Sequence, residues 1–101
     1  MNKLTDLEIC KRIAEIEGYL FGTTHGTPVI VFNQDDVQSF NPLTDDALLN
    51  QLIFKYEISI SFNFCLISMI TDKQYEMNFT DIPSLKRKCL LLIIKAHKDI
   101  N

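Results

Sequence analysis

The sequence predicts an α+β fold in a single domain that spans residues 1–101. Segments with helical periodicity lie at both ends of the chain and near its middle. One segment alternates strictly between apolar and polar residues, and the other predicted strands are short and joined by brief turns. Short strands in such meanders pair antiparallel. The predicted order is therefore α-β-β-α-β-β-β-α, with an antiparallel sheet and helices packed on one of its faces.

Length and composition narrow the classes of protein that the chain can be. With 101 residues, 47% of them hydrophobic, it fills one core, and three glycines and three prolines exclude collagen-like or low-complexity sequence. A net charge of −3 disfavours a general nucleic-acid binder. Asp6 and Glu8 interrupt the start where a signal peptide would be apolar, and no apolar run approaches the ~20 residues of a membrane helix. We expect a cytoplasmic protein with no membrane partner.

The first helix begins at Thr5. Thr5 and Glu8 have the spacing of a capping box, in which each side chain accepts a hydrogen bond from the other residue's backbone N–H. Gly18 predicts the helix end. Two adjacent apolar stripes predict a wide buried face, formed by Leu7, Cys10 and Ala14 and by Ile9, Ile13, Ile16 and Leu20.

The next part of the chain reads as a loop and two strands. Residues 21–28 contain two glycines, three threonines and a proline, which predict a loop. Residues 29–32 and 37–40 are predicted strands on either side of a turn at 33–36. Asn41-Pro42 then ends the sheet, and Thr44 is the predicted N-cap of the second helix.

Residues 57–64 give the clearest strand signal of the chain. Ile58, Ile60, Phe62 and Phe64 alternate with polar residues, which predicts one buried and one solvated face. Residues 65–70 and 75–79 are predicted partner strands, with a turn at 71–74 between them.

Pro83 opens the third helix, which is predicted to run to about Lys98. At 100° per residue its apolar residues gather on one side, which is predicted to face the sheet: Leu85, Cys89, Leu92, Ile93, Ala96 and Ile100. The opposite side is basic, but it also contains Leu91 and Ile94. Apolar residues ringed by cations are typical of a partner-binding surface. The predicted partner-binding residues are Arg87, Lys88, Leu91, Ile94, Lys95 and Lys98. Another part of the fold, or a second copy of the chain, could equally cover the two apolar residues.

Charge is unevenly distributed along the chain. Residues 1–50 hold eight acidic and three basic residues, whereas residues 51–101 hold five acidic and seven basic ones. A weakly basic C-terminal helix on an acidic body can orient the molecule on an acidic partner or favour self-association.

Three blocks of sequence resemble the NinX-like family of small proteins encoded by phages and prophages. They are residues 4–9, the segment 40–47 followed by Leu52-Ile53 and Ile58-Ser59-Ile60, and residues 82–87 ahead of an apolar helix. The chain departs from the family at Leu48-Leu49, where an aromatic residue, typically Trp, is frequent. The resemblance implies a phage or prophage origin and action in the cytoplasm of the bacterial host, and it supplies no catalytic residues.

Other candidate sites have a simpler structural interpretation. Gly22, His25 and Gly26 could form a ligand-binding loop, but no phosphate-binding motif or following helix accompanies them. The pairs Asp35-Asp36 and Asp45-Asp46 suit a turn and a helix N-terminus, so we expect no metal. The odd number of cysteines, Cys10, Cys65 and Cys89, argues against a disulfide framework and predicts small core residues.

The function expected from these observations is a non-enzymatic interaction protein without a cofactor. It would bind and modulate a host or phage protein as an anti-defence inhibitor or an infection accessory factor, and it could form a homodimer. One alternative is a small-molecule or nucleotide-binding protein or enzyme that uses the loop from Gly22 to Gly26. Another is weak nucleic-acid binding through the basic helix, which the low number of cations disfavours.

Overall fold

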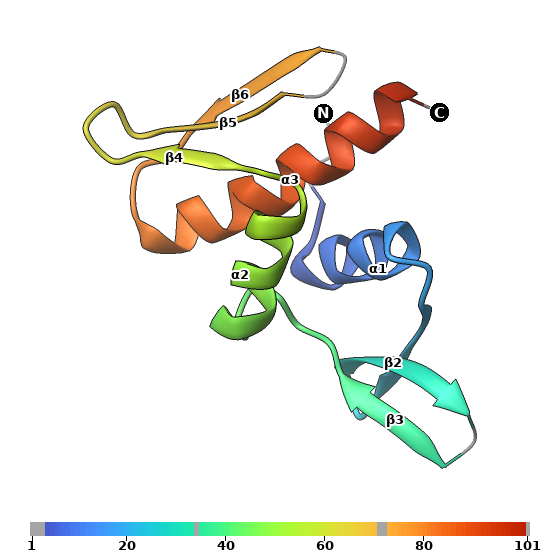
Figure 1. The fold of residues 1–101 in the computed structure, drawn as a ribbon. Helices are drawn as coiled ribbons and strands as arrows, with labels where there is room; N and C mark the ends of the chain where they lie inside the picture. The colour runs from blue at the N-terminus through green and yellow to red at the C-terminus, as the bar shows by residue number, and fades with distance from the viewer. Residues whose placement is uncertain (1–3, 34, 71–72, 101) are drawn as a thin grey trace.

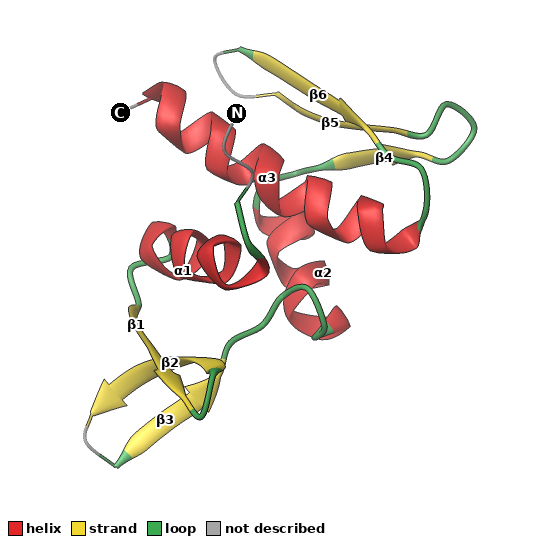
Figure 2. Cartoon of the chain, turned by 180° about the vertical axis from the view of Figure 1, so that it is seen from behind, coloured by secondary structure: helices red, strands yellow, loops and turns green. Residues whose placement is uncertain are grey.

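Two small antiparallel sheets flank a layer of three helices (Figures 1 and 2). The computed structural model describes residues 4–33, 35–70 and 73–100. The elements in chain order are α1 (Asp6–Ile16), β1 (Leu20–Thr24), β2 (Thr27–Asn33), β3 (Asp36–Ser39), α2 (Asp46–Lys55), β4 (Ser59–Ser61), β5 (Leu66–Ile70), β6 (Gln74–Asn78) and α3 (Ile82–Ile100). The α+β class and the antiparallel pairing are confirmed, but there are two sheets, in the orders β1-β2-β3 and β4-β5-β6. The turns predicted at 33–36 and 71–74 include residues 34 and 71–72, which lie outside the described residues.

The extra strand, β1, occupies much of the predicted loop at 21–28. Thr24 lies directly opposite Thr27, so only His25 and Gly26 form the turn between β1 and β2. Both have positive φ, 52° and 78°, as a two-residue turn matched to the strand twist requires. The prediction of a loop was wrong because Gly26 forms a hairpin turn, and the threonines beside that turn favour strands. Leu20, assigned by periodicity to the first helix, lies in β1 instead.

Both helix ends before the sheets use the same backbone geometry. Gly18 follows α1 with φ of 82°, and the Tyr19 N–H donates to the Ala14 carbonyl at 2.9 Å. Glu57 follows α2 with φ of 52°, and the Ile58 N–H donates to the Ile53 carbonyl at 3.0 Å. These bonds satisfy carbonyls that a helix end leaves open. The predicted capping box at Thr5 is confirmed, whereas Asp45 rather than Thr44 caps α2.

The core lies around α3. This helix packs against β5 and β6 on one side and against α1 on the other. Its fully buried residues are Cys89, Leu90, Leu92 and Ile93. They meet Ile9 and Ile13 from α1 and Ile67 and Met69 from β5. The predicted sheet-facing residues of α3 are thus buried wherever their side chains are described, which leaves out Ile100.

The predicted strand at 57–64 is shorter than its alternation suggests. Only Ser59 to Ser61 form β4, and the chain then turns, with Cys65 at φ of 50°. Phe62 and Phe64 are therefore 63% and 76% exposed rather than buried. Cys65 is also exposed, so its assignment to the core was wrong, whereas Cys10 and Cys89 are buried. Apolar and polar residues alternate as far as Phe64, but the pairing with β5 ends at Ser61.

Candidate functional site

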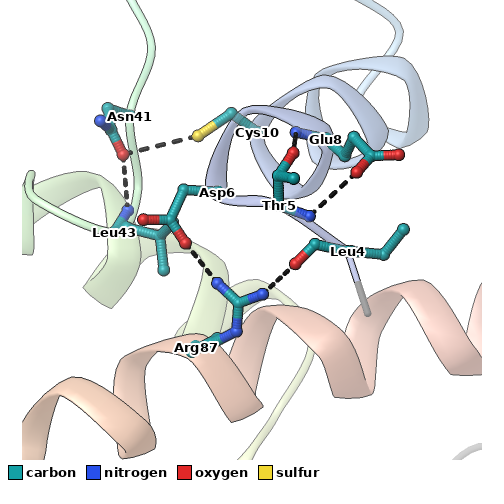
Figure 3. A network of polar contacts seen from close by, with 8 residues as sticks. All are labelled: Leu4, Thr5, Asp6, Glu8, Cys10, Asn41, Leu43 and Arg87. Atoms are coloured by element: carbon teal, nitrogen blue, oxygen red, sulfur yellow. Dashed lines mark hydrogen bonds and ion pairs between the residues drawn. The ribbon is translucent and has the colours of Figure 1, made fainter. Parts of the chain in front are cut away.

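Polar contacts tie α1 to the start of α3 and to the segment that precedes α2 (Figure 3). The guanidinium of Arg87, from α3, donates to the Asp6 carboxylate and to the Leu4 carbonyl. The neighbouring Lys86 pairs with Asp46 of α2 at 2.6 Å. Arg87 is largely buried, and its Nε has no hydrogen-bond partner. These pairs fix the start of α3 against the starts of both other helices.

Asn41 holds the segment between β3 and α2 against α1 (Figure 3). Its side-chain oxygen accepts from the Leu43 N–H at 3.2 Å and from the Cys10 thiol at 3.5 Å. Its carbonyl accepts from the backbone N–H groups of Thr44 and Asp45, at 3.0 and 2.9 Å. The Asn-Pro segment therefore turns the chain from β3 into α2 while it is held against α1. These contacts give the sequence blocks a structural role.

The predicted partner-binding residues of α3 do not form one exposed surface. Ile94 is 8% exposed and belongs to the core, and the half-buried Leu91 packs against that core. Arg87 points at Asp6, and only Lys95 and Lys98 are exposed, with Lys88 half-buried. Of the two possibilities that the sequence left open for Ile94, the structure has coverage by another part of the fold, because Ile94 is buried beside α1.

The candidate ligand loop is part of the first hairpin. Gly22 lies in β1, directly opposite Val29, whereas His25 and Gly26 form the exposed turn. A Cβ added to Gly22 would meet the Val31 side chain at 3.7 Å, which is an ordinary contact. The three residues are thus spread over a strand and its turn, and they do not converge on one point.

The buried thiols are poor nucleophiles. Burial raises the pKa of Cys89 to about 11, and burial together with the Asp6 charge raises the pKa of Cys10 to about 11. Both therefore stay protonated near neutral pH, whereas a reactive cysteine is a thiolate. Across the described residues, no group of three or more His, Cys, Asp and Glu side chains could hold a metal ion.

A half-buried carboxylate joins the C-terminal ends of α1 and α2. Glu17 accepts from the Tyr56 hydroxyl at 2.6 Å and pairs with the Lys55 ammonium at 2.8 Å. Burial, and then the hydrogen bond to Glu17, raise the pKa of Tyr56. Beside this cluster lies a hollow of about 360 Å³, which is lined by Tyr19, just before β1, and by Phe32 of β2. Leu48 lines the same hollow from α2.

The β1–β3 sheet presents a face that carries no charge. Leu20, Val31 and Val37 lie directly opposite one another across the three strands, so their side chains form one row. In β strands, alternate residues share a face. The residues of this face, here called the outer face, are Leu20, Gly22, Thr24, Thr27, Val29, Val31, Val37 and Ser39. Leu20 is 69% and Val37 44% exposed, whereas Val31 is half-buried and Val29 is buried. The other side carries Phe21 and Ile30, which pack on the core.

Sequence reasoning missed the outer face. It placed Leu20 in a helix and the residues after it in a loop. Leu20 was therefore not recognised as the cross-strand neighbour of Val31. The signal that could have shown this strand is its alternation. Leu20, Gly22 and Thr24 share one face, and Phe21 between them points to the other face. Threonines on both sides of a two-residue turn that contains glycine indicate a hairpin.

Comparison of the chain with family models, with curated proteins and with solved structures gave no match. The resemblance to NinX-like proteins therefore stays a prediction from the three sequence blocks. In the described part of the chain, no helix combines the length and apolar character needed to cross a membrane.

Proposed function

We propose that this chain is a phage- or prophage-encoded, non-enzymatic protein that binds a host or phage protein in the bacterial cytoplasm. The observation that carries the proposal is the uncharged outer face, with Leu20, Val31 and Val37 aligned across three strands. Interfaces have an apolar centre depleted of charge and a polar rim. The row has exposed apolar residues at both ends, Leu20 and Val37, and such a surface on a small domain is the kind that a partner covers.

Charge near this face indicates the chemistry of the partner. Asp35 and Asp36 lie at the exposed tip of the β2–β3 hairpin, and the first half of the chain is acidic. A partner surface with an apolar centre and basic residues at one edge would match this layout. Such complementarity raises the association rate and fixes the orientation of binding. The role would be that of an anti-defence inhibitor or an infection accessory factor, which acts by occupying its partner.

Affinity capture from phage-infected bacteria tests this proposal. Leu20→Asp puts a charge into the centre of the outer face and should reduce the captured partner at least tenfold. Ile70→Asp is the matched control, because Ile70 is 70% exposed, like Leu20 at 69%, but lies in β5. The control should capture the partner as the wild type does. Equal capture by both variants, with both folded by circular dichroism, would refute a role for the outer face.

A further inference from the structure

The hollow beside Glu17, here called the trough, follows one side of α2. The residues that line it from this helix and its N-cap recur every three or four positions: Asp45, Leu48, Gln51, Leu52 and Lys55. Residues with this spacing form one stripe along a helix. At 1.5 Å per residue, the stripe is about 15 Å long from Asp45 to Lys55. The two charged residues of the stripe therefore lie at its opposite ends.

The opposite wall of the trough belongs to the inner side of the first sheet. Ile30 of β2 and Gln38 of β3 lie directly opposite each other, and both line the trough. Along their strands they alternate with Val31 and Val37, which belong to the outer face. The trough and the outer face therefore lie on opposite sides of the sheet.

Three aromatic rings also line the trough. Phe40 is only 2% exposed, and the Tyr19 ring meets it edge to face, with the ring centroids 5.9 Å apart. Tyr19 makes a second edge-to-face contact with Phe32, at 6.0 Å. Such contacts hold rings in place. Tyr19 nevertheless remains 40% exposed and Phe32 49% exposed, and exposed aromatic rings attract cations.

One cation of the chain is held in this way at the C-terminal end of α2. The Lys55 ammonium pairs with the Glu17 carboxylate at 2.8 Å and lies 5.6 Å from the centre of the Tyr56 ring. A carboxylate and an aromatic ring together therefore fix its position. Because Glu17 neutralises it, this ammonium does not compensate Asp45 at the other end of the stripe, about 15 Å away.

Asp45 has no cation of its own in the part of the chain that the structure describes. Its Oδ1 accepts a hydrogen bond from the Leu48 N–H at 3.2 Å, and the residue is exposed. Two carboxylates and one ammonium line the trough, so its net charge is −1. The amides of Gln38 and Gln51 add carbonyl oxygens that accept hydrogen bonds. The trough thus combines aromatic rings with an uncompensated carboxylate.

We infer that the trough binds the guanidinium group of an arginine residue from another polypeptide. A guanidinium is flat, stacks on aromatic rings and has five N–H donors for carboxylate and amide oxygens, whereas an ammonium is compact and strongly hydrated. A volume of about 360 Å³ is at the small end of ligand pockets and suits one side chain. Free arginine would also need a cation for its α-carboxylate, and the Lys55 ammonium is paired with Glu17.

This inference goes beyond the proposed function. The outer face lies on the other side of the sheet and contributes nothing to arginine binding, so either surface could be disproved without the other.

A titration followed by NMR tests the inference on the full chain. The probe is arginine blocked at both ends, N-acetyl-arginine N-methylamide, and the control is the same compound of citrulline, which has a similar shape without the charge. Blocked arginine should shift the ring signals of Tyr19 and Phe32 with a dissociation constant of about 1–10 mM. Free arginine should bind no more tightly, and blocked citrulline at least tenfold more weakly.

Two variants test the carboxylate. Asp45→Asn removes the charge but keeps the helix cap, because Asn caps helices as well as Asp does. It should weaken the binding of blocked arginine about threefold, the effect of an exposed ion pair. Asp35→Asn is the matched control, because it removes an exposed carboxylate at the hairpin tip, outside the trough. It should leave binding unchanged, and thermal unfolding checks that both variants fold.

Four outcomes would overturn the inference. The first is the absence of a saturable shift up to about 50 mM, where a millimolar site is nearly full. The second is equal binding of arginine and citrulline, because the charge is then not recognised. The third is an equal effect of both aspartate variants, because the probe then responds to the overall charge. The fourth is clearly tighter binding of free than of blocked arginine, because the ligand is then a small molecule.

Discussion

The two sheets have the same connectivity but different surroundings. Each is a three-stranded antiparallel meander in which strands adjacent in sequence are adjacent in space. In the β4–β6 sheet, Ile67, Met69 and Tyr75 are buried against the helices, whereas all four residues of β3 in the first sheet are exposed. The second sheet therefore stabilises the core. The first sheet contributes less to the core and offers a whole face.

The largest expected effect is on the free energy of unfolding, which should fall much more when the second sheet is altered than when the first is. Ile67→Ala removes a fully buried side chain from the central strand of the second sheet and should lower the free energy of unfolding by about 3 kcal/mol. Val37→Ala, at the edge of the first sheet, should cost about 0.5 kcal/mol. Urea denaturation measures both values. Similar losses would show that the two sheets contribute equally to the core.

The stability of the protein at alkaline pH should depend on two buried thiols, Cys10 on α1 and Cys89 on α3. Cys10 lines a hollow beside Pro28 of the first sheet, and Cys89 lines one beside Ile60 of the second. Their pKa values are raised to about 11, so above about pH 9 the unfolded chain loses these protons before the folded chain does. Stability should be complete below pH 9 and fall by about 2 kcal/mol per thiol as the pH approaches 11.

Alanine variants assign that pH dependence to one thiol or the other. Cys89→Ala and Cys10→Ala should each reduce the alkaline loss, as followed by urea midpoints between pH 7 and about 11. The raised pKa of Tyr56 adds a loss of the same sign at higher pH, which Tyr56→Phe should remove. A pH dependence unchanged by both cysteine variants would contradict the assignment.

The hairpin turns differ in how well their residues suit them. Gly26 of the first sheet and Cys65 of the second both have positive φ, 78° and 50°. Only glycine adopts this conformation without steric cost. Gly26→Ala should therefore destabilise the protein by about 1 kcal/mol, and Cys65→Gly should stabilise it by up to about 1 kcal/mol. Thermal unfolding at pH 7 distinguishes the two signs, and a stabilising Gly26→Ala would contradict the turn geometry.

The smallest effect concerns the ion pair beside β4. Asp46 is mostly exposed, so its pair with Lys86 is screened by water and salt. Lys86→Ala should cost about 0.5 kcal/mol or less, and high salt should abolish the difference from the wild type. A cost above 1 kcal/mol, measured by the same denaturation, would show that the pair does more than join two surface groups.

Local chemistry in the sequence predicted the helices well. The capping box at Thr5, the glycine after α1 and the proline in the first turn of α3 act through neighbours only a few residues away, and all three occur as expected. The predictions that failed depend on distant parts of the chain. Ile94 is buried because α1, some eighty residues earlier, packs against its helix. Phe62 is exposed because pairing with β5 ends at Ser61.

The candidate surfaces were harder to predict than the elements. A strand reveals its alternation in the sequence, but which of its faces is covered depends on the whole fold. The outer face needed the register of three strands, which the sequence does not give.

The position of α3 has a consequence for synthesis on the ribosome. This helix supplies the centre of the core and, through Arg87, is tied to Asp6 across 81 residues of sequence. Both sheets and the first two helices are synthesised before any of α3 is made. Until then, Ile9 and Ile13 on α1 and Ile67 on β5 lack the helix that buries them. The nascent chain therefore exposes apolar surface through most of its synthesis, and its folding is completed only after the last helix emerges.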